Sequence, residues 1–155
     1  MYEPIRTKSV HTMAAAPEIP HRSREEELEI RLAGQLTALL TVTDELHALA
    51  TRDGGAPDGA APDGAALDGA ALSAAAKRIA EQVARLSGGH YPRRAEPSDS
   101  GSPSRPEALQ QRAHTLAGNA LAVATSRGDT AAMALAAERM EAHAAPRRDR
   151  DLATA

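Results

Sequence analysis

The sequence contains no cysteine, no phenylalanine and no tryptophan, and only two tyrosines. Without cysteine the chain forms no disulfide, offers no thiolate nucleophile and supplies no cysteine ligand for zinc or an iron–sulfur cluster. Aromatic rings bury the most apolar area per side chain, so their scarcity leaves leucine, valine, isoleucine, methionine and many alanines to form the core. We therefore expect a core of small side chains, whose stability is marginal or depends on a partner.

The net charge is also small, and long apolar runs are missing. The formal net charge of −3 and an isoelectric point near 6.1 create no positive field that would attract nucleic acid or an acidic membrane. No apolar stretch approaches the roughly 18 residues of a membrane span, and residues 1–20 lack the apolar centre of a signal peptide. We expect no nucleic acid and no membrane as partners, and a cytoplasmic location. The excess of arginine over lysine indicates a GC-rich bacterial genome.

Strong helix formers dominate the residues that are present, whereas the β-branched and aromatic residues that favour strands are rare. The first helix signal lies at Ser23, whose hydroxyl can cap a helix while Glu26 reaches back to it in the capping-box pattern. Apolar and small residues then recur at alternating spacings of four and three, as in a coiled-coil seam. This seam consists of Leu32, Leu36, Leu39, Thr43, Leu46 and Ala50. The pattern predicts a long helix over residues 24–51.

Residues 52–71 contain a pentapeptide that occurs three times. The copies are Pro57-Asp-Gly-Ala-Ala, Pro62-Asp-Gly-Ala-Ala and Leu67-Asp-Gly-Ala-Ala. A period of five matches neither a helix nor a strand, and proline with glycine prevents regular structure. A binding repeat is one interpretation of such a segment. We interpret it instead as a flexible linker, because its composition is of low complexity.

A second helix and a second linker follow. The four-and-three spacing returns between Leu72 and Leu86, and Gly88 with Gly89 supplies a C-terminal stop. Residues 89–104 are rich in proline, serine and glycine, which is typical of a flexible linker. The sequence thus predicts a short helix over residues 72–86 and an irregular segment after it.

The last part of the chain predicts a tight antiparallel helical hairpin. Ser104 and Glu107 match another capping box. Gly128 suits the left-handed residue that ends a helix, and Asp129 suits the N-cap of the next one, which should stop before Pro146. The predicted apolar seams are Leu109, Ala113, Leu116, Ala120 and Val123 on the first helix, and Met133, Ala136 or Ala137, Met140 and Ala144 on the second.

Together these signals predict an all-α protein. A disordered N-terminal segment spans residues 1–22, a helical domain interrupted by the linkers 52–71 and 89–104 spans residues 23–145, and a disordered tail spans residues 146–155. The first and last helices are net acidic and the two between them are net basic, which favours antiparallel packing of neighbours. The helices form either a four-helix bundle or paired helical hairpins that a second copy of the chain completes.

The six histidines invite a metal-binding interpretation, which their spacing does not support. They stand at positions 11, 21, 47, 90, 114 and 143. No two are four residues apart on a helix, and neither a His-Glu-x-x-His motif nor the Glu-x-x-His pair of di-iron bundles occurs. No glycine-rich phosphate loop follows a strand, and no arrangement of nucleophile and base is recognisable. We therefore expect no metal, no cofactor and no catalytic residues, and so no enzyme.

One string in the third predicted helix resembles a known signalling motif. The string is Ala113-His114-Thr115-Leu116-Ala117-Gly118-Asn119-Ala120. It is similar to the phosphorylatable segment of histidine phosphotransfer domains, which are four-helix bundles. The resemblance implies that His114 accepts phosphate and that Gly118 lets a response regulator approach. Ala117 stands where that family has a lysine that stabilises the phosphate, so we expect no stable phosphoryl group on His114.

The remaining signal is the leucine-rich seam of the first helix. Its apolar stripe is widened by Leu40 beyond what one neighbouring helix can cover. We predict that Leu32, Leu36, Leu39, Leu40 and Leu46 form an interaction surface. The expected function is that of a helical protein that acts through protein–protein interaction, in a regulatory or related role, as a homo-oligomer or with another protein. The alternative is a histidine-phosphotransfer-like signalling bundle that uses His114.

Overall fold

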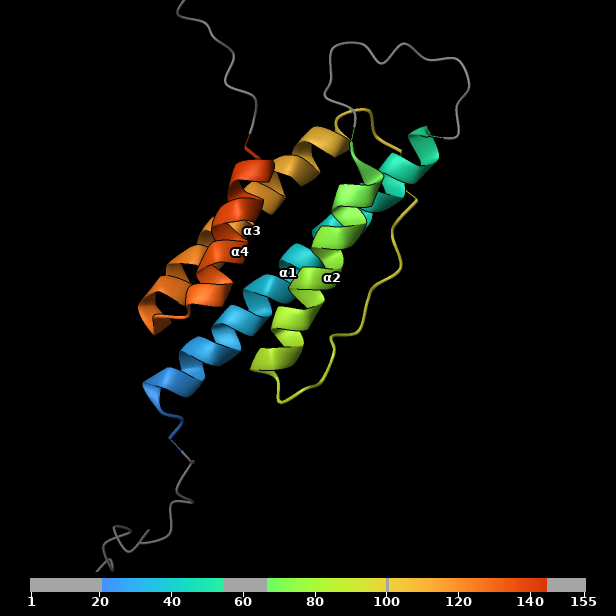
Figure 1. Ribbon diagram of the computed structural model, residues 1–155. Coiled ribbons are helices and arrows are strands. Elements are labelled where there is room, and N and C mark those ends of the chain that lie inside the picture. Colours follow the sequence, from blue (N-terminus) through green and yellow to red (C-terminus); the bar gives the residue numbers. More distant parts are fainter. Residues whose placement is uncertain (1–20, 55–66, 100, 145–155) are drawn as a thin grey trace, which may run out of the picture.

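The computed structural model describes residues 21–54, 67–99 and 101–144. Within these residues the chain forms four helices and no strand (Figure 1). The helices are α1 (Arg24–Asp53), α2 (Gly69–Leu86), α3 (Arg105–Arg127) and α4 (Thr130–Ala142). The predicted all-α fold is confirmed. Most of the two terminal segments predicted to be disordered lies outside the described residues.

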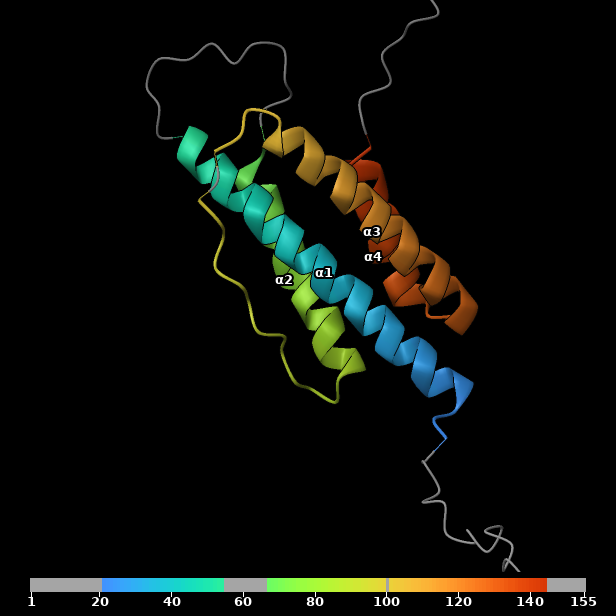
Figure 2. The ribbon, with the colours of Figure 1, turned by 180° about the vertical axis from the view of Figure 1, so that it is seen from behind.

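The helices pack as a bundle in which α1 is central. It contacts both α2 and α3, and α3 also contacts α4 (Figures 1 and 2). Along the chain the helices run up, down, down and up, because the segment after α2 returns along the bundle before α3 begins. The fourth side lies between α2 and α4, which touch only slightly. Of the two predicted arrangements, the described residues thus form the four-helix bundle.

The start of α1 follows the predicted capping box. The hydroxyl of Ser23 accepts a hydrogen bond from the Glu26 amide at 3.2 Å, and the Glu26 carboxylate accepts one from the Ser23 amide at 2.9 Å. The two bonds satisfy amides that a helix start otherwise leaves without partners. At its other end α1 continues to Asp53, slightly beyond the predicted end at residue 51.

The third copy of the pentapeptide belongs to α2, which corrects the prediction that residues 52–71 are all linker. Leu67 packs against the hydrophobic core, and Asp68 is the N-cap of α2, with its carboxylate accepting a hydrogen bond from the Ala71 amide at 3.0 Å. This copy begins with leucine where the other two begin with proline. The leucine adds apolar contact, and the aspartate can then cap a helix. The first two copies lie mostly outside the described residues.

The start of α3 differs from the prediction. Ser104 is the N-cap, but its backbone is already helical (φ −86°, ψ −3°), and its hydroxyl makes no capping bond. A serine caps a helix when its own backbone is extended, so the capping box expected with Glu107 is not formed. The hydroxyl lies 3.2 Å from that of Ser102 instead.

The turn between α3 and α4 agrees with the prediction. Gly128 has φ +67°, a left-handed conformation that strains residues with a side chain. Asp129 then caps α4 by accepting a hydrogen bond from the Ala132 amide at 3.1 Å. The two residues reverse the chain within one short connection, so α3 and α4 form the expected hairpin.

The buried face of α3 is made of alanines, which confirms Ala113 and Ala120 of the predicted seam and corrects its larger members. Leu109, Leu116 and Val123 are only partly buried. The fully buried positions are Ala113, Ala117, Ala120 and Ala124. Leucines of α1 already fill the centre of the bundle, and small residues let α3 approach α1 closely while its larger side chains lie at the edge of the contact. On α4, likewise, the buried positions are Ala132, Leu135, Ala136 and Arg139, and the two predicted methionines are partly buried.

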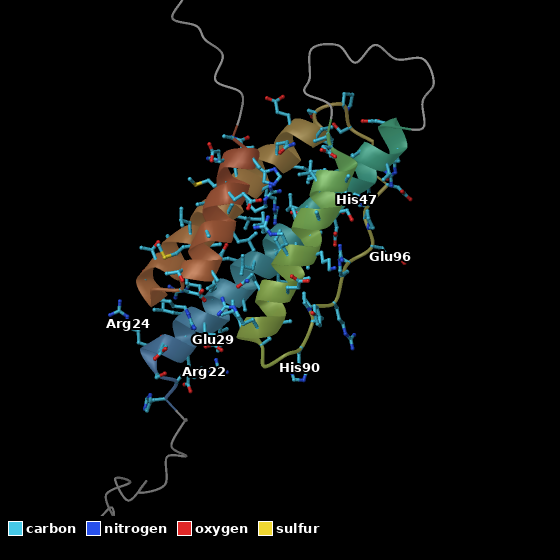
Figure 3. All side chains as sticks on the ribbon, viewed as in Figure 1. Arg22, Arg24, Glu29, His47, His90 and Glu96 are labelled. Atoms are coloured by element: carbon cyan, nitrogen blue, oxygen red, sulfur yellow. The ribbon has the colours of Figure 1, made fainter. Side chains whose placement is uncertain are left out.

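Between α2 and α3, residues 87–99 and 101–104 are irregular, as predicted for the segment after α2, and we call them the strap. It is tied to α1 by contacts that the sequence did not predict. The Arg94 guanidinium donates two hydrogen bonds to the Asp44 carboxylate, one of them from Nε at 2.8 Å. The Ser98 amide donates to the Glu45 carboxylate at 2.9 Å. Figure 3 labels His90 and Glu96 along this segment.

Candidate functional site

The five leucines predicted to form an interaction surface lie in the core of the single chain. Leu32, Leu36, Leu39 and Leu46 are 0% exposed and Leu40 is 1% exposed. The helix stripe is wide because α1 is central and is covered by α2 on one side and α3 on another. In the single chain these residues therefore belong to the core, and their role as an interaction surface stays a prediction. Their apolar area stabilises the fold itself.

A different surface lacks charge. Residues 32–43 of α1 and residues 113–126 of α3 contain no charged side chain, although both stretches reach the molecular surface. Their exposed positions are Gly34, Thr41, Thr115, Asn119, Ala122, Thr125 and Ser126. Leu116 and Val123 of α3 are partly exposed. Ile30 of α1, just before residues 32–43, is 53% exposed. We call this surface the uncharged face.

Ion pairs between α1 and α3 mark the two ends of the uncharged face. Arg127 donates to Glu29 at 3.1 Å, near the start of α1, and Arg105 donates to Glu45 at 2.5 Å, farther along it. The stretches between the pairs therefore lie side by side, as Figure 2 shows, and Figure 3 labels Glu29 at the lower end. Burial opposes ionisation of Glu45, but the Ser98 amide and Arg105 outweigh it and lower the pKa of that carboxyl. These four charges at the ends of the face are thus paired within the chain.

The side between α2 and α4 is closed by charged groups. Arg78 donates two hydrogen bonds to the Glu138 carboxylate, at 2.7 and 2.8 Å, and Arg85 donates one to Asp129 at 2.7 Å. The hydrogen bonds from Arg78 lower the pKa of Glu138. These pairs join a basic helix to an acidic one, as the predicted alternation of helix charge requires. Figure 3 shows polar side chains in the space between the two helices.

At one end of this side a cleft of about 210 Å³ opens between α2, α3 and α4. Its lining is formed by Leu67, Asp68, Ala71, Leu72, Gln110, Arg139, Ala142 and His143. Two polar residues of the lining are buried: Arg139 is 9% exposed and His143 is 4% exposed. The sequence analysis missed this site, because neither residue belongs to a recognisable motif and the lining comes from three helices.

His143 is held in the cleft by a short hydrogen bond. Its Nδ1 lies 2.6 Å from Oε1 of Gln110, and because a carbonyl oxygen only accepts, Nδ1 is the donor. Burial, together with the positive charge of Arg139 and the nearby His114, lowers the pKa of His143 to about 4. The imidazole is therefore neutral near pH 7. Its Nε2 is then an acceptor, and it is buried without a partner among the described residues.

His114, the predicted phosphoacceptor, lies between α3 and α4. Its Nδ1 lies 2.7 Å from the carbonyl oxygen of Met140 and donates to it. The ring is partly buried, Ala117 is fully buried, and the sulfur of Met140 lies against Gly118, 3.5 Å from the position a Cβ would take. Gly118 therefore gives α4 room to approach α3. The phosphoacceptor role of His114 stays a prediction.

Within the described ranges, no group of three or more histidine or acidic side chains is placed to hold a metal ion. None of the helices in that part of the chain combines the length and the hydropathy that crossing a lipid bilayer requires. Comparisons of the chain with protein-family models, with curated proteins and with solved structures found no match.

Proposed function

We propose that this chain is a helical interaction protein whose docking surface is the uncharged face of α1 and α3. The observation that carries the proposal is the length of helix surface without charge: residues 32–43 and 113–126 lie side by side and are partly exposed. Surface helices normally present charged and polar side chains to water. A contiguous face without charge, with partly exposed leucine and valine, is typical of the centre of a protein interface.

The occupant that we propose for this face is a second copy of the chain. Two copies that meet through the same uncharged face place no like charges opposite each other, although each carries a net charge of −3. A contact of the same patch with itself is the commonest symmetry of homo-oligomers. The exposed Gly34 has no atom within 4 Å of the position a Cβ would take, so a facing helix can approach α1 closely there.

Sedimentation equilibrium of the full chain at micromolar concentrations tests this proposal. We expect the wild-type chain to sediment as a dimer and the Ala122→Glu variant as a monomer, because the substitution places an unpaired carboxylate inside the contact. The matched control is Ala74→Glu, which changes an exposed alanine of α2, outside the uncharged face. This control should remain dimeric.

Helix content, measured by circular dichroism, should be the same in all three proteins, because both alanines are exposed and lie within helices. A wild-type chain that stays monomeric from micromolar to millimolar concentration contradicts the proposed dimer. A dimer that Ala122→Glu leaves intact shows that the copies meet through another surface. Either result overturns the assignment of the uncharged face to self-association.

A further inference from the structure

The cleft between α2, α3 and α4 contains a guanidinium with too few partners for its burial. Arg139 is 9% exposed and directly follows Glu138 in the chain. Its Nη2 donates one hydrogen bond to the Glu138 carboxylate at 3.2 Å, and its Nε has no partner among the described residues. The same carboxylate already accepts two shorter hydrogen bonds from Arg78. A buried arginine is costly unless an anion pairs with it and its N–H groups are satisfied.

The rest of the lining defines what kind of anion fits. Leu67, Ala71, Leu72 and Ala142 supply apolar wall, and Gln110 is occupied by His143. Within the described lining, Arg139 is the one residue that carries positive charge at neutral pH. Asp68, on the opposite helix, is the one that carries negative charge, and it is engaged in capping α2. The cleft therefore suits a ligand that combines one negative charge with an apolar body.

We propose that this cleft binds a small monocarboxylate with a short aliphatic body. The carboxylate pairs with the guanidinium of Arg139, whose planar fork of donors matches the two oxygens of a carboxylate. The aliphatic part packs against the leucines and alanines of the wall. A dianion such as phosphate fits this lining less well, because it meets only one arginine, carries no apolar body and is repelled by Asp68.

The binding test uses the full chain and isovalerate as the probe, followed by two-dimensional amide NMR. We expect saturable shifts confined to the ends of the three helices that line the cleft, near residues 67–72, 110 and 139–143. Isovaleramide, which has nearly the same shape but no charge, is the matched ligand control. It should bind roughly ten- to a hundredfold more weakly, because it lacks the charge-assisted hydrogen bonds.

Two pairs of variants test the residues. Arg139→Gln should weaken isovalerate binding by a similar factor, whereas Arg112→Gln, at an exposed position of α3, should not. The thermal midpoint of Arg139→Gln without ligand should equal or exceed that of the wild type, because an underpaired buried charge has been removed. Ala71→Glu adds a carboxylate at an exposed position of the cleft and should weaken binding more than Ala71→Gln, which adds a side chain of similar size without charge.

Three results would overturn the proposal. The first is the absence of saturable shifts at the cleft when isovalerate is added to the wild-type chain. The second is equal binding of isovalerate and isovaleramide, which would make the cleft a purely apolar cavity. The third is unchanged isovalerate binding in Ala71→Glu, a variant whose exposed position gives no reason for misfolding. These results are independent of the oligomeric state, so this site and the proposed dimer succeed or fail separately.

Discussion

Arg139 and His143 lie one helical turn apart on α4 and are both buried, although polar side chains are usually exposed. The neighbours determine the state of each. The Gln110 carbonyl fixes the proton of His143 on Nδ1, and the charge of Arg139 disfavours a second proton. A neutral histidine leaves Arg139 without a competing cation in the cleft. His143 therefore stays uncharged mainly because it is buried, and the charge of Arg139 acts in the same direction.

The low pKa of His143 predicts a loss of stability in weak acid. The unfolded chain takes up a proton at this histidine near the ordinary pKa of 6.5, but the folded chain does so only near 4. His143 therefore leaves the free energy of unfolding unchanged above pH 6.5. As the pH falls from 6.5 toward 4, this histidine lowers the free energy of unfolding by about 3 kcal/mol in total. Urea titrations at a series of pH values measure it.

His143→Gln is the matched variant for this experiment, because glutamine is polar but does not titrate. Its free energy of unfolding should depend less steeply on pH than that of the wild type between pH 6.5 and 4. The carboxyl groups whose pKa is lowered in the folded chain, such as Glu45 and Glu138, act in both proteins and cancel in the comparison. Parallel pH profiles of the two proteins would refute a depressed pKa at His143.

At the scale of the elements, the three pentapeptides show how one residue changes the structure of a repeat. All three contain Asp-Gly-Ala-Ala, but only the third has leucine at its first position. Leu67 packs on the core, and this contact accompanies the start of α2 at Gly69. Asp68 was predicted to lie in a linker, but it is the N-cap of α2.

The repeats supply their own control for the capping role of Asp68. Asp68→Ala should lower the free energy of unfolding by about 1 kcal/mol, because the Ala71 amide loses its hydrogen-bond acceptor. Asp58→Ala makes the same change in the first copy, where Pro57 and Gly59 disfavour a helix, and should have no measurable effect. Denaturant unfolding followed by circular dichroism compares the two. Equal effects would show that the aspartates do not differ in role.

At the scale of the whole molecule, the leucines of α1 hold the bundle together from its centre. α3 contributes alanines to the same core, so the area buried between α1 and α3 depends on the α1 side chains. Truncating a leucine that is 0% exposed in one chain should lower the free energy of unfolding by about 2–5 kcal/mol. The proposed self-association therefore depends on other residues of α1 than folding does.

Leu39→Asp and Thr41→Asp separate these two roles. Leu39→Asp should unfold the chain, because it puts a charge into the core and costs more than about 3 kcal/mol. Thr41 is exposed on the uncharged face, so Thr41→Asp should keep the wild-type helix content and weaken the proposed dimer. Circular dichroism and sedimentation of both variants measure this. A folded, monomeric Leu39→Asp would restore the view that the leucines form the interaction surface.

The sequence alone determined the features that depend on near neighbours in the chain. The capping box of Ser23 with Glu26 joins residues three apart, and the turn at Gly128 and Asp129 is equally local. The four-and-three spacing identified the buried side of α1, because that helix is covered on a wide arc. Helix existence, approximate bounds and the all-α class follow from such local signals.

The tertiary structure decided which side of each later helix is buried and where the polar groups meet. Arg78 and Glu138 are separated by 60 positions, and Arg94 and Asp44 by 50, so no local pattern pairs them. The same holds for the alanine face of α3, the third repeat, the strap and the cleft at Arg139 and His143. Each depends on which distant surface a segment contacts, because burial and the electrostatic environment are properties of the packed neighbours and not of sequence spacing.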